Sequence, residues 1–149
     1  MKPRELLSEL GGICLIGLAA FLLLSVVTFS AADLPGYSFP PPAEPSNAGG
    51  SLGVAVGGGL IRWVGGLGAL GAGLFLLHFG WSCLRRALER KEVVAAERVE
   101  PLRRISAGLV CVLVLAVLET GLAETGWGSL SRGLHPGGYW GIFLHAELS

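Results

Sequence analysis

The chain has 149 residues, of which 52% are hydrophobic, only 15% are charged and 24 are glycines. Average globular chains carry about 25% charged residues and about 7% glycine, so this composition excludes an ordinary soluble domain and is typical of an integral membrane protein. The formal net charge is +0, and nearly all the basic residues lie in two short stretches separated by long uncharged intervals.

The first uncharged interval, residues 10–29, predicts a transmembrane helix. At 1.5 Å per residue, a helix of this length crosses the hydrocarbon core, which is about 30 Å thick. A cleaved signal peptide is the alternative, because Ser30-Ala31-Ala32 offers the small residues that signal peptidase prefers. The length of the apolar stretch and the acidic residues Glu5 and Glu9 beside the basic N-terminus argue against it.

A proline-rich segment, residues 30–48, follows and is expected to be extended and irregular, without a folded domain. The next stretch, 49–61, is apolar and rich in glycine, and it is either interfacial or the beginning of a long second helix. Residues 63–84 form the second predicted span, with Trp63 and Trp81 near its two ends, where indole rings prefer to lie.

Residues 85–104 form a charged connector, which we expect to extend as a helix into the cytoplasm, because residues 83–99 are strong helix formers with no Gly or Pro. Its arginines alternate with glutamates, so a solvated connector is favoured over a surface for DNA or acidic lipid. The third predicted span, 105–121, is long enough only if Glu119, Thr120 and Gly121 lie in the headgroup region.

The fourth predicted span begins near Gly137, but only thirteen residues remain, and these include His145 and Glu147. Thirteen residues cannot cross a bilayer as a helix. Two alternatives stay open at this stage: the natural product continues past Ser149, or the chain is a truncated relic whose last segment lies in the interface.

Basic residues predict the orientation of the chain. They flank the first span at Lys2 and Arg4 and fill the middle connector, whereas the two other connections carry only Arg62 and Arg132. By the positive-inside rule, the N-terminus and the middle connector are cytoplasmic.

A glycine motif occurs twice. Gly49-Gly50-Ser51-Leu52-Gly53 returns 88 residues later as Gly137-Gly138-Tyr139-Trp140-Gly141, each time before an apolar stretch. The repeat predicts two tandem transmembrane hairpins, and small residues four apart suggest faces for close helix packing. The candidate packing residues are Gly49, Gly50, Gly53, Gly65, Ala69, Gly73, Gly137, Gly138 and Gly141.

Signals for chemistry are lacking in the sequence. Cys14, Cys83 and Cys111 fall in or beside predicted spans and are interpreted as packing residues. The three histidines have no metal-ligand spacing, and neither lysine follows a glycine as a phosphate-binding loop requires. We therefore assign no catalytic residue, metal or cofactor to these residues.

The order of these pieces resembles the N-terminal four-helix membrane domain of FtsK/SpoIIIE-type bacterial DNA translocases. The similarity rests on a first span followed by Asp33-Leu34-Pro35, the proline-rich loop, residues 47–53, a glycine-rich second span, the charged connector and the second glycine motif. It implies a multi-pass anchor in the bacterial inner membrane that oligomerises a translocase during cell division and chromosome segregation, among septum proteins. In that family, DNA and ATP are bound by a separate motor domain, which these residues do not contain.

The sequence thus predicts an all-α integral membrane protein with three full spans and an incomplete fourth. Its partners are expected to be the lipid bilayer and further copies of itself. Two alternative functions remain: a stand-alone membrane scaffold for division proteins, or a small transporter or pore subunit. The latter needs polar residues along a water path, and the spans offer little beyond Ser25 and His78.

Overall fold

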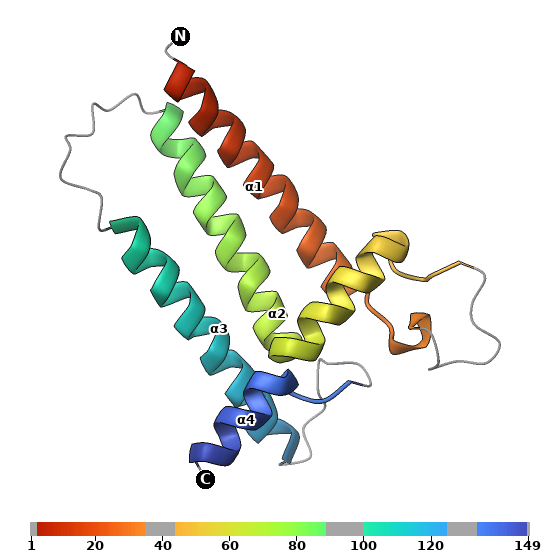
Figure 1. The fold of residues 1–149 in the computed structure, drawn as a ribbon. Coiled ribbons are helices and arrows are strands. Elements are labelled where there is room, and N and C mark those ends of the chain that lie inside the picture. The colour runs from red at the N-terminus through yellow and green to blue at the C-terminus, as the bar shows by residue number, and fades with distance from the viewer. Residues whose placement is uncertain (1–2, 35–43, 89–99, 125–133, 149) are drawn as a thin grey trace.

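The computed structural model of the chain describes residues 3–34, 44–88, 100–124 and 134–148 (Figure 1). These residues form four α-helices, α1 (Pro3–Val27), α2 (Gly50–Leu88), α3 (Glu100–Glu124) and α4 (Gly138–Leu148), with a short 3-10 helix η1 (Ala31–Asp33) after α1. No strand occurs in the described ranges. Three helices contain stretches long and apolar enough to cross a membrane, Glu9–Val27, Gly50–Arg85 and Arg103–Ala123. The predicted class, an all-α membrane fold with a shorter fourth helix, is confirmed.

The three long helices lie side by side with α2 in the middle (Figure 1). α1 and α3 run in the same direction, and the longer part of α2 runs back between them. The short α4 packs against the end of α3 and against α2. The start of α1, the end of α2 and the start of α3 consequently share one end of the bundle, and the glycine motifs share the other.

α2 is broken at Gly65, which has φ 74° and ψ 177°. Glycine reaches this left-handed region without the steric cost that a side chain would impose. The break separates a lead-in segment, residues 50–64, from a crossing segment, residues 66–88, and the two point in clearly different directions (Figure 1). The stretch 49–61, whose conformation the sequence left open, is thus almost entirely helical but not collinear with the span.

The length of α2 exceeds what one membrane crossing requires. Thirty-nine residues in one straight helix would extend about 58 Å, nearly twice the thickness of the hydrocarbon core. The crossing segment alone extends about 34 Å, which suits a membrane span. The break therefore lets the lead-in segment pack across the end of α1.

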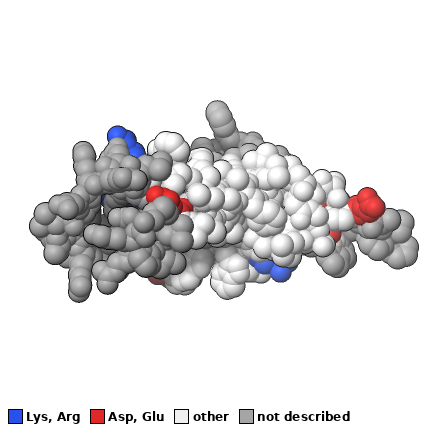
Figure 2. Space-filling model, turned by 90° about the horizontal axis from the view of Figure 1, so that it is seen from above, with Lys and Arg blue, Asp and Glu red and all other residues white. Residues whose placement is uncertain are grey.

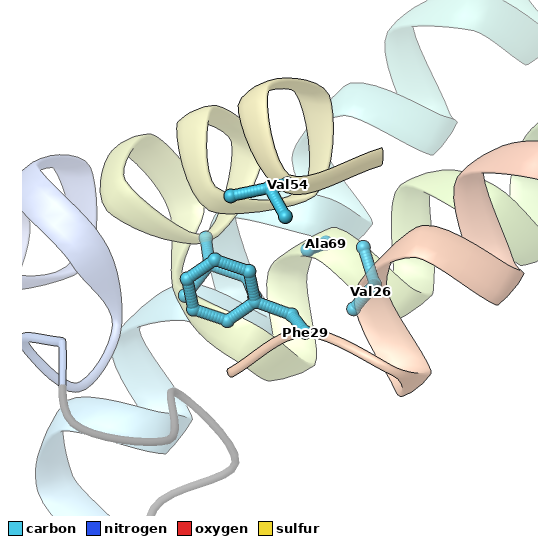
Figure 3. Packing of buried hydrophobic residues seen from close by; sticks show 5 residues of the cluster. Val26, Phe29, Val54 and Ala69 are labelled. Atoms are coloured by element: carbon cyan, nitrogen blue, oxygen red, sulfur yellow. The ribbon is translucent and has the colours of Figure 1, made fainter. Parts of the chain in front are cut away.

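A small apolar core lies where the end of α1 meets the two segments of α2. Its buried members are Val26, Phe29, Val54, Ile61 and Ala69. Figure 3 shows the Phe29 ring against the lead-in segment, with Val26, Val54 and Ala69 around it. Phe29 and Ile61 are fully buried, so this cluster holds the lead-in segment onto the hairpin.

Elsewhere the helices expose large apolar side chains. Examples are Leu18 on α1, Leu74 on α2 and Leu109 on α3, each at least half exposed. The described part of the face in Figure 2 is mostly uncharged, with a few acidic and basic side chains. An apolar exterior of this extent in water would promote aggregation, whereas in a bilayer it faces lipid.

Glycines allow α1 and the crossing segment to approach closely. A Cβ atom at Gly12 would lie 2.9 Å from the Leu84 nitrogen, and one at Gly80 would lie 3.0 Å from the Ile16 nitrogen. At Gly73 it would lie 2.6 Å from Cδ2 of Leu23. Of these three glycines, only Gly73 was predicted from the sequence as a packing residue. Gly73 and Gly80 are seven residues apart, a helical spacing that places both on one face.

Much of two predicted segments lies outside the described residues. Residues 35–43 belong to the proline-rich loop, and residues 89–99 belong to the connector for which we expected a helical extension. Both expectations stay predictions.

We predict that Gly12→Leu destabilises the helix bundle by about 1–3 kcal/mol, because the new side chain would be forced against the backbone of α2. Gly11→Leu is the matched control, since a Cβ atom there would meet nothing within 4 Å. Unfolding of the purified chain in mixed micelles, followed by circular dichroism, measures both. Equal stability of the two variants would contradict the close approach.

Candidate helix-packing site

The first glycine motif starts α2 with a compact turn. Gly50 N donates to Asn47 O at 2.8 Å, and Gly53 N donates to Gly49 O at 3.0 Å. Asn47 is buried; its Nδ2 donates to Ser25 O at 2.8 Å, and its Oδ1 accepts from Gly49 N at 2.9 Å. Asn47 thus links the end of α1 to the start of α2 by hydrogen bonds. Asparagine is favoured at positions just before a helix, where its side-chain oxygen accepts from a backbone amide. The sequence analysis included Asn47 in the family pattern but assigned it no role.

Ser25 lies beneath the glycines of this motif. Its Oγ donates to Phe21 O at 2.7 Å within α1, and the residue is fully buried. A Cβ atom at Gly49 would lie 3.0 Å from that Oγ, and one at Gly53 would lie 3.2 Å from it. The first motif therefore packs on α1 of the same chain.

The second glycine motif repeats this geometry. Gly138 N donates to His135 O at 3.1 Å, and Gly141 N donates to Gly137 O at 2.9 Å. Gly138 has φ 62°, the same value as Gly50 at the equivalent position. Thr120 takes the place of Ser25, because its Oγ1 lies 3.1 Å from Ala116 O, one helical turn earlier, and donates to it.

Thr120 also reaches the turn itself. Its Oγ1 lies 3.3 Å from Pro136 O, directly before the glycine pair. A Cβ atom at Gly141 would lie 2.7 Å from the same Oγ1. The two hydroxyl residues, Ser25 and Thr120, are 95 residues apart in the sequence, whereas the two glycine motifs are 88 residues apart. The connection from the hydroxyl residue to its glycine motif is therefore seven residues shorter in the second hairpin than in the first. The two hairpins are therefore built on one plan with different loops.

The start of α4 also contacts the break in α2. A Cβ atom at Gly138 would lie 2.6 Å from Gly65 N and 2.7 Å from Trp63 O. One at Gly65 would lie 2.5 Å from Gly137 Cα. The rings of Trp63 and Tyr139 add an edge-on contact, with centroids 5.6 Å apart. The two hairpins meet at this point, backbone against backbone.

This contact corrects the expectation for Gly65. A spacing of four predicts one helical face for Gly65, Ala69 and Gly73. Ala69 and Gly73 do lie on the crossing segment and face α1, in the apolar core and against Leu23 respectively. Gly65 is not helical, and it faces α3 and α4 instead. The spacing argument failed there because it assumes an unbroken helix.

Glu119 is the charged residue of the site. It is only 2% exposed, and its Oε2 accepts a hydrogen bond from Leu67 N at 2.8 Å. Leu67 lies in the first turn of the crossing segment, where the amides lack helical acceptors and the helix dipole favours negative charge. The carboxylate of Glu119 is directed toward α2, a contact that the sequence did not predict.

The described residues offer no other chemistry at this site. They contain no group of three or more His, Cys, Asp or Glu residues that could hold a metal ion. Cys14, Cys83 and Cys111 are free thiols, and His78 is exposed. The hydrogen bonds and glycine contacts of this site hold the ends of the helices together.

A protein-family model described as the 4TM region of DNA translocase FtsK/SpoIIIE matches residues 4–149. Searches of curated proteins and of solved structures find no match.

Outside the packed helices, Asp33 closes the base of the first loop. Its Oδ1 accepts from Ser46 N at 3.0 Å, and its Oδ2 accepts from Ser46 Oγ at 2.8 Å. Nearby, Ala48 N donates to Thr28 Oγ1 at 3.0 Å. The backbone hydrogen bond from Ser46, with help from its hydroxyl, holds the pKa of the Asp33 carboxyl below its ordinary value of 3.8.

We predict that this closure depends on pH. Because folding lowers the pKa of Asp33, the closure contributes stability above about pH 3.8 and is lost as the pH falls through the lower, folded value. The protection factor of the Ser46 amide against hydrogen exchange, measured by NMR between pH 6 and pH 2, should drop in that acidic range. Asp33→Asn removes the titrating group and should abolish the pH dependence. Persistence of that dependence in Asp33→Asn would exclude Asp33 as its source.

Proposed function

The chain belongs to the family of the 4TM region of FtsK/SpoIIIE DNA translocases, and we propose that it anchors a DNA-translocating motor in the bacterial inner membrane. In this role it would bring copies of the motor together during cell division and chromosome segregation. The observation that carries the proposal is the match over residues 4–149, together with three helices able to cross a membrane. In this family the membrane region and the motor are separate domains. DNA and ATP would be handled by the motor, and septum proteins are further candidate partners.

The distribution of charge supports a cytoplasmic N-terminus. The start of α1, the end of α2 and the start of α3 lie at one end of the bundle (Figure 1). Arg85 and Arg86 lie near the end of α2, and Arg103 and Arg104 lie near the start of α3. Basic residues gathered at one end favour that end as the cytoplasmic one. The glycine motifs and the loop closed by Asp33 would then face outward.

The chemistry of the interior also favours an anchor. Among the residues that the structure describes, the buried polar ones are Ser25, Asn47, Glu119 and Thr120, and each bonds to backbone groups near helix ends. Within the described ranges, no buried side-chain nitrogen or oxygen lacks a hydrogen-bond partner. Polar groups of a transport path would instead be arranged along it to meet water or an ion.

A fused motor predicts a large native product. We expect an immunoblot of the source cell, with an antibody raised against residues 85–104, to detect a protein several times larger than 15.5 kDa. Preabsorbing the antibody with the immunising peptide is the control. A specific band at 15.5 kDa would favour a stand-alone membrane scaffold and remove the DNA-pumping part of the proposal.

If the domain oligomerises, its assembly should depend on the glycine motifs through the fold of each hairpin. We predict that Gly50→Leu and Gly138→Leu reduce the oligomers trapped by chemical crosslinking of the detergent-solubilised protein. Both positions have positive φ, which costs an L-residue about 1–2 kcal/mol, and Gly138 also touches α2. Gly59→Leu is the matched control, since it has open space and lies within the lead-in segment. An oligomer distribution unchanged from wild type in both motif variants would count against the role.

A further inference from the structure

After the break at Gly65, a backbone amide in the first turn of the crossing segment donates to a side chain of another helix. Leu67 N donates to Glu119 Oε2 at 2.8 Å. A carboxylate that is only 2% exposed is costly unless charge or hydrogen bonding compensates it. The positive end of the crossing segment supplies both kinds of compensation. Glu119 and the break therefore stabilise each other.

Adjacent residues on α3 hold two different elements. Glu119 Oε2 accepts from the crossing segment of α2, whereas Thr120 Oγ1 lies 3.3 Å from Pro136 O ahead of α4. The glycine pair that follows Pro136 lies against the backbone of Trp63 and Gly65. The break in α2 thus contacts both α3 and the residues at the start of α4.

We propose that Glu119 is a conformational latch: it keeps α2 bent at Gly65 while the hairpin of α3 and α4 is docked, so that undocking of this hairpin and straightening of α2 form one coupled transition. The proposal concerns this chain alone and holds whether or not a motor is attached to it.

The two forms of α2 exchange one set of interactions for another. In the bent form, the helix loses backbone hydrogen bonds at Gly65 but gains the carboxylate of Glu119 and the apolar contacts of the lead-in segment with Phe29. In the straight form, Gly65 would adopt helical angles and the ladder of backbone hydrogen bonds would be complete. Glycine permits both backbone states, so interactions from neighbouring helices decide between them.

Straightening of α2 would also change the first hairpin. The lead-in segment begins at the turn that Asn47 ties to Ser25 O, and its Val54 and Ile61 belong to the apolar core. A change at α3 would therefore move the turn at the end of α1. This gives the two hairpins a route by which each responds to the position of the other.

The distance between the two segments of α2 tests the latch. Spin labels at Leu52 and Trp81, both exposed, report on the lead-in and crossing segments respectively. Pulsed EPR would be recorded on the full 149-residue chain, with its three cysteines replaced by alanine, in bilayers of phosphatidylethanolamine and phosphatidylglycerol. A straight helix would separate the two labelled backbone positions by about 44 Å, and a bent one by clearly less.

We expect wild type to give the shorter distance and Glu119→Leu to shift the distribution toward about 44 Å. Glu119→Gln keeps an oxygen acceptor for Leu67 N, so most of its population should stay bent. Leu118→Ala is the control on the same helix, because Leu118 is exposed and should not affect the distance. A Glu119→Leu distribution identical to that of wild type would overturn the latch.

A crosslink tests the coupling separately. A disulfide between cysteines at positions 63 and 139, where Trp63 and Tyr139 now touch, would hold α4 on α2. In the Glu119→Leu background, this bond should restore the shorter distance. A distance that stays long with the bond formed would refute the coupling. If Glu119→Leu fails to insert into the membrane, Gly65→Ala is used in its place. Alanine disfavours positive φ, so this variant should also shift the label distance toward that of a straight helix. An unshifted distance in Gly65→Ala would overturn the proposal.

Discussion

The backbone of α2 is the constraint on which the rest of the structure depends. Its 39 residues are too many for one crossing, and Gly65 divides them into a lead-in segment and a crossing segment. In a membrane every backbone amide needs a partner, so a break in a helix must be compensated by neighbouring groups. Here Glu119 supplies a carboxylate, and the absence of side chains at Gly137 and Gly138 lets α4 approach the break. The second hairpin is therefore part of what makes the bend possible.

The two hairpins share a local design but differ in what they rest on. In each, a hydroxyl one turn from its carbonyl partner lies beneath a glycine pair, Ser25 in the first and Thr120 in the second. The first glycine turn packs on α1, its own hairpin partner. The second packs on α3 and on the broken backbone of α2 as well. The repeat thus produces two similar turns, of which only the second joins the hairpins.

The features of the fold that depend on local composition could be predicted from the sequence. Charge-free intervals predict three helices able to cross a membrane, and a repeated glycine motif marks the start of α2 and α4. The features that it missed, Asn47, Gly12, Gly80 and the inward turn of Glu119, depend on which residues of different helices face each other. The predicted helical face of Gly65 was wrong for a related reason. Residues spaced by four look identical in the sequence whether the helix is continuous or broken between them. The neighbouring Gly66 makes the local pattern look like ordinary small-residue packing.

The same contacts bear on what such a domain can do. An anchor must hold its helices in fixed register while presenting an apolar exterior to lipid, and close backbone contacts through glycine suit that purpose. In the described helices, the buried hydroxyl, amide and carboxylate groups are engaged at helix ends, where they satisfy backbone donors and acceptors. Interactions of this kind act on helix geometry and leave the spans apolar. Close contacts of this kind between the two hairpins favour the proposed role of an anchor over that of a path for a solute.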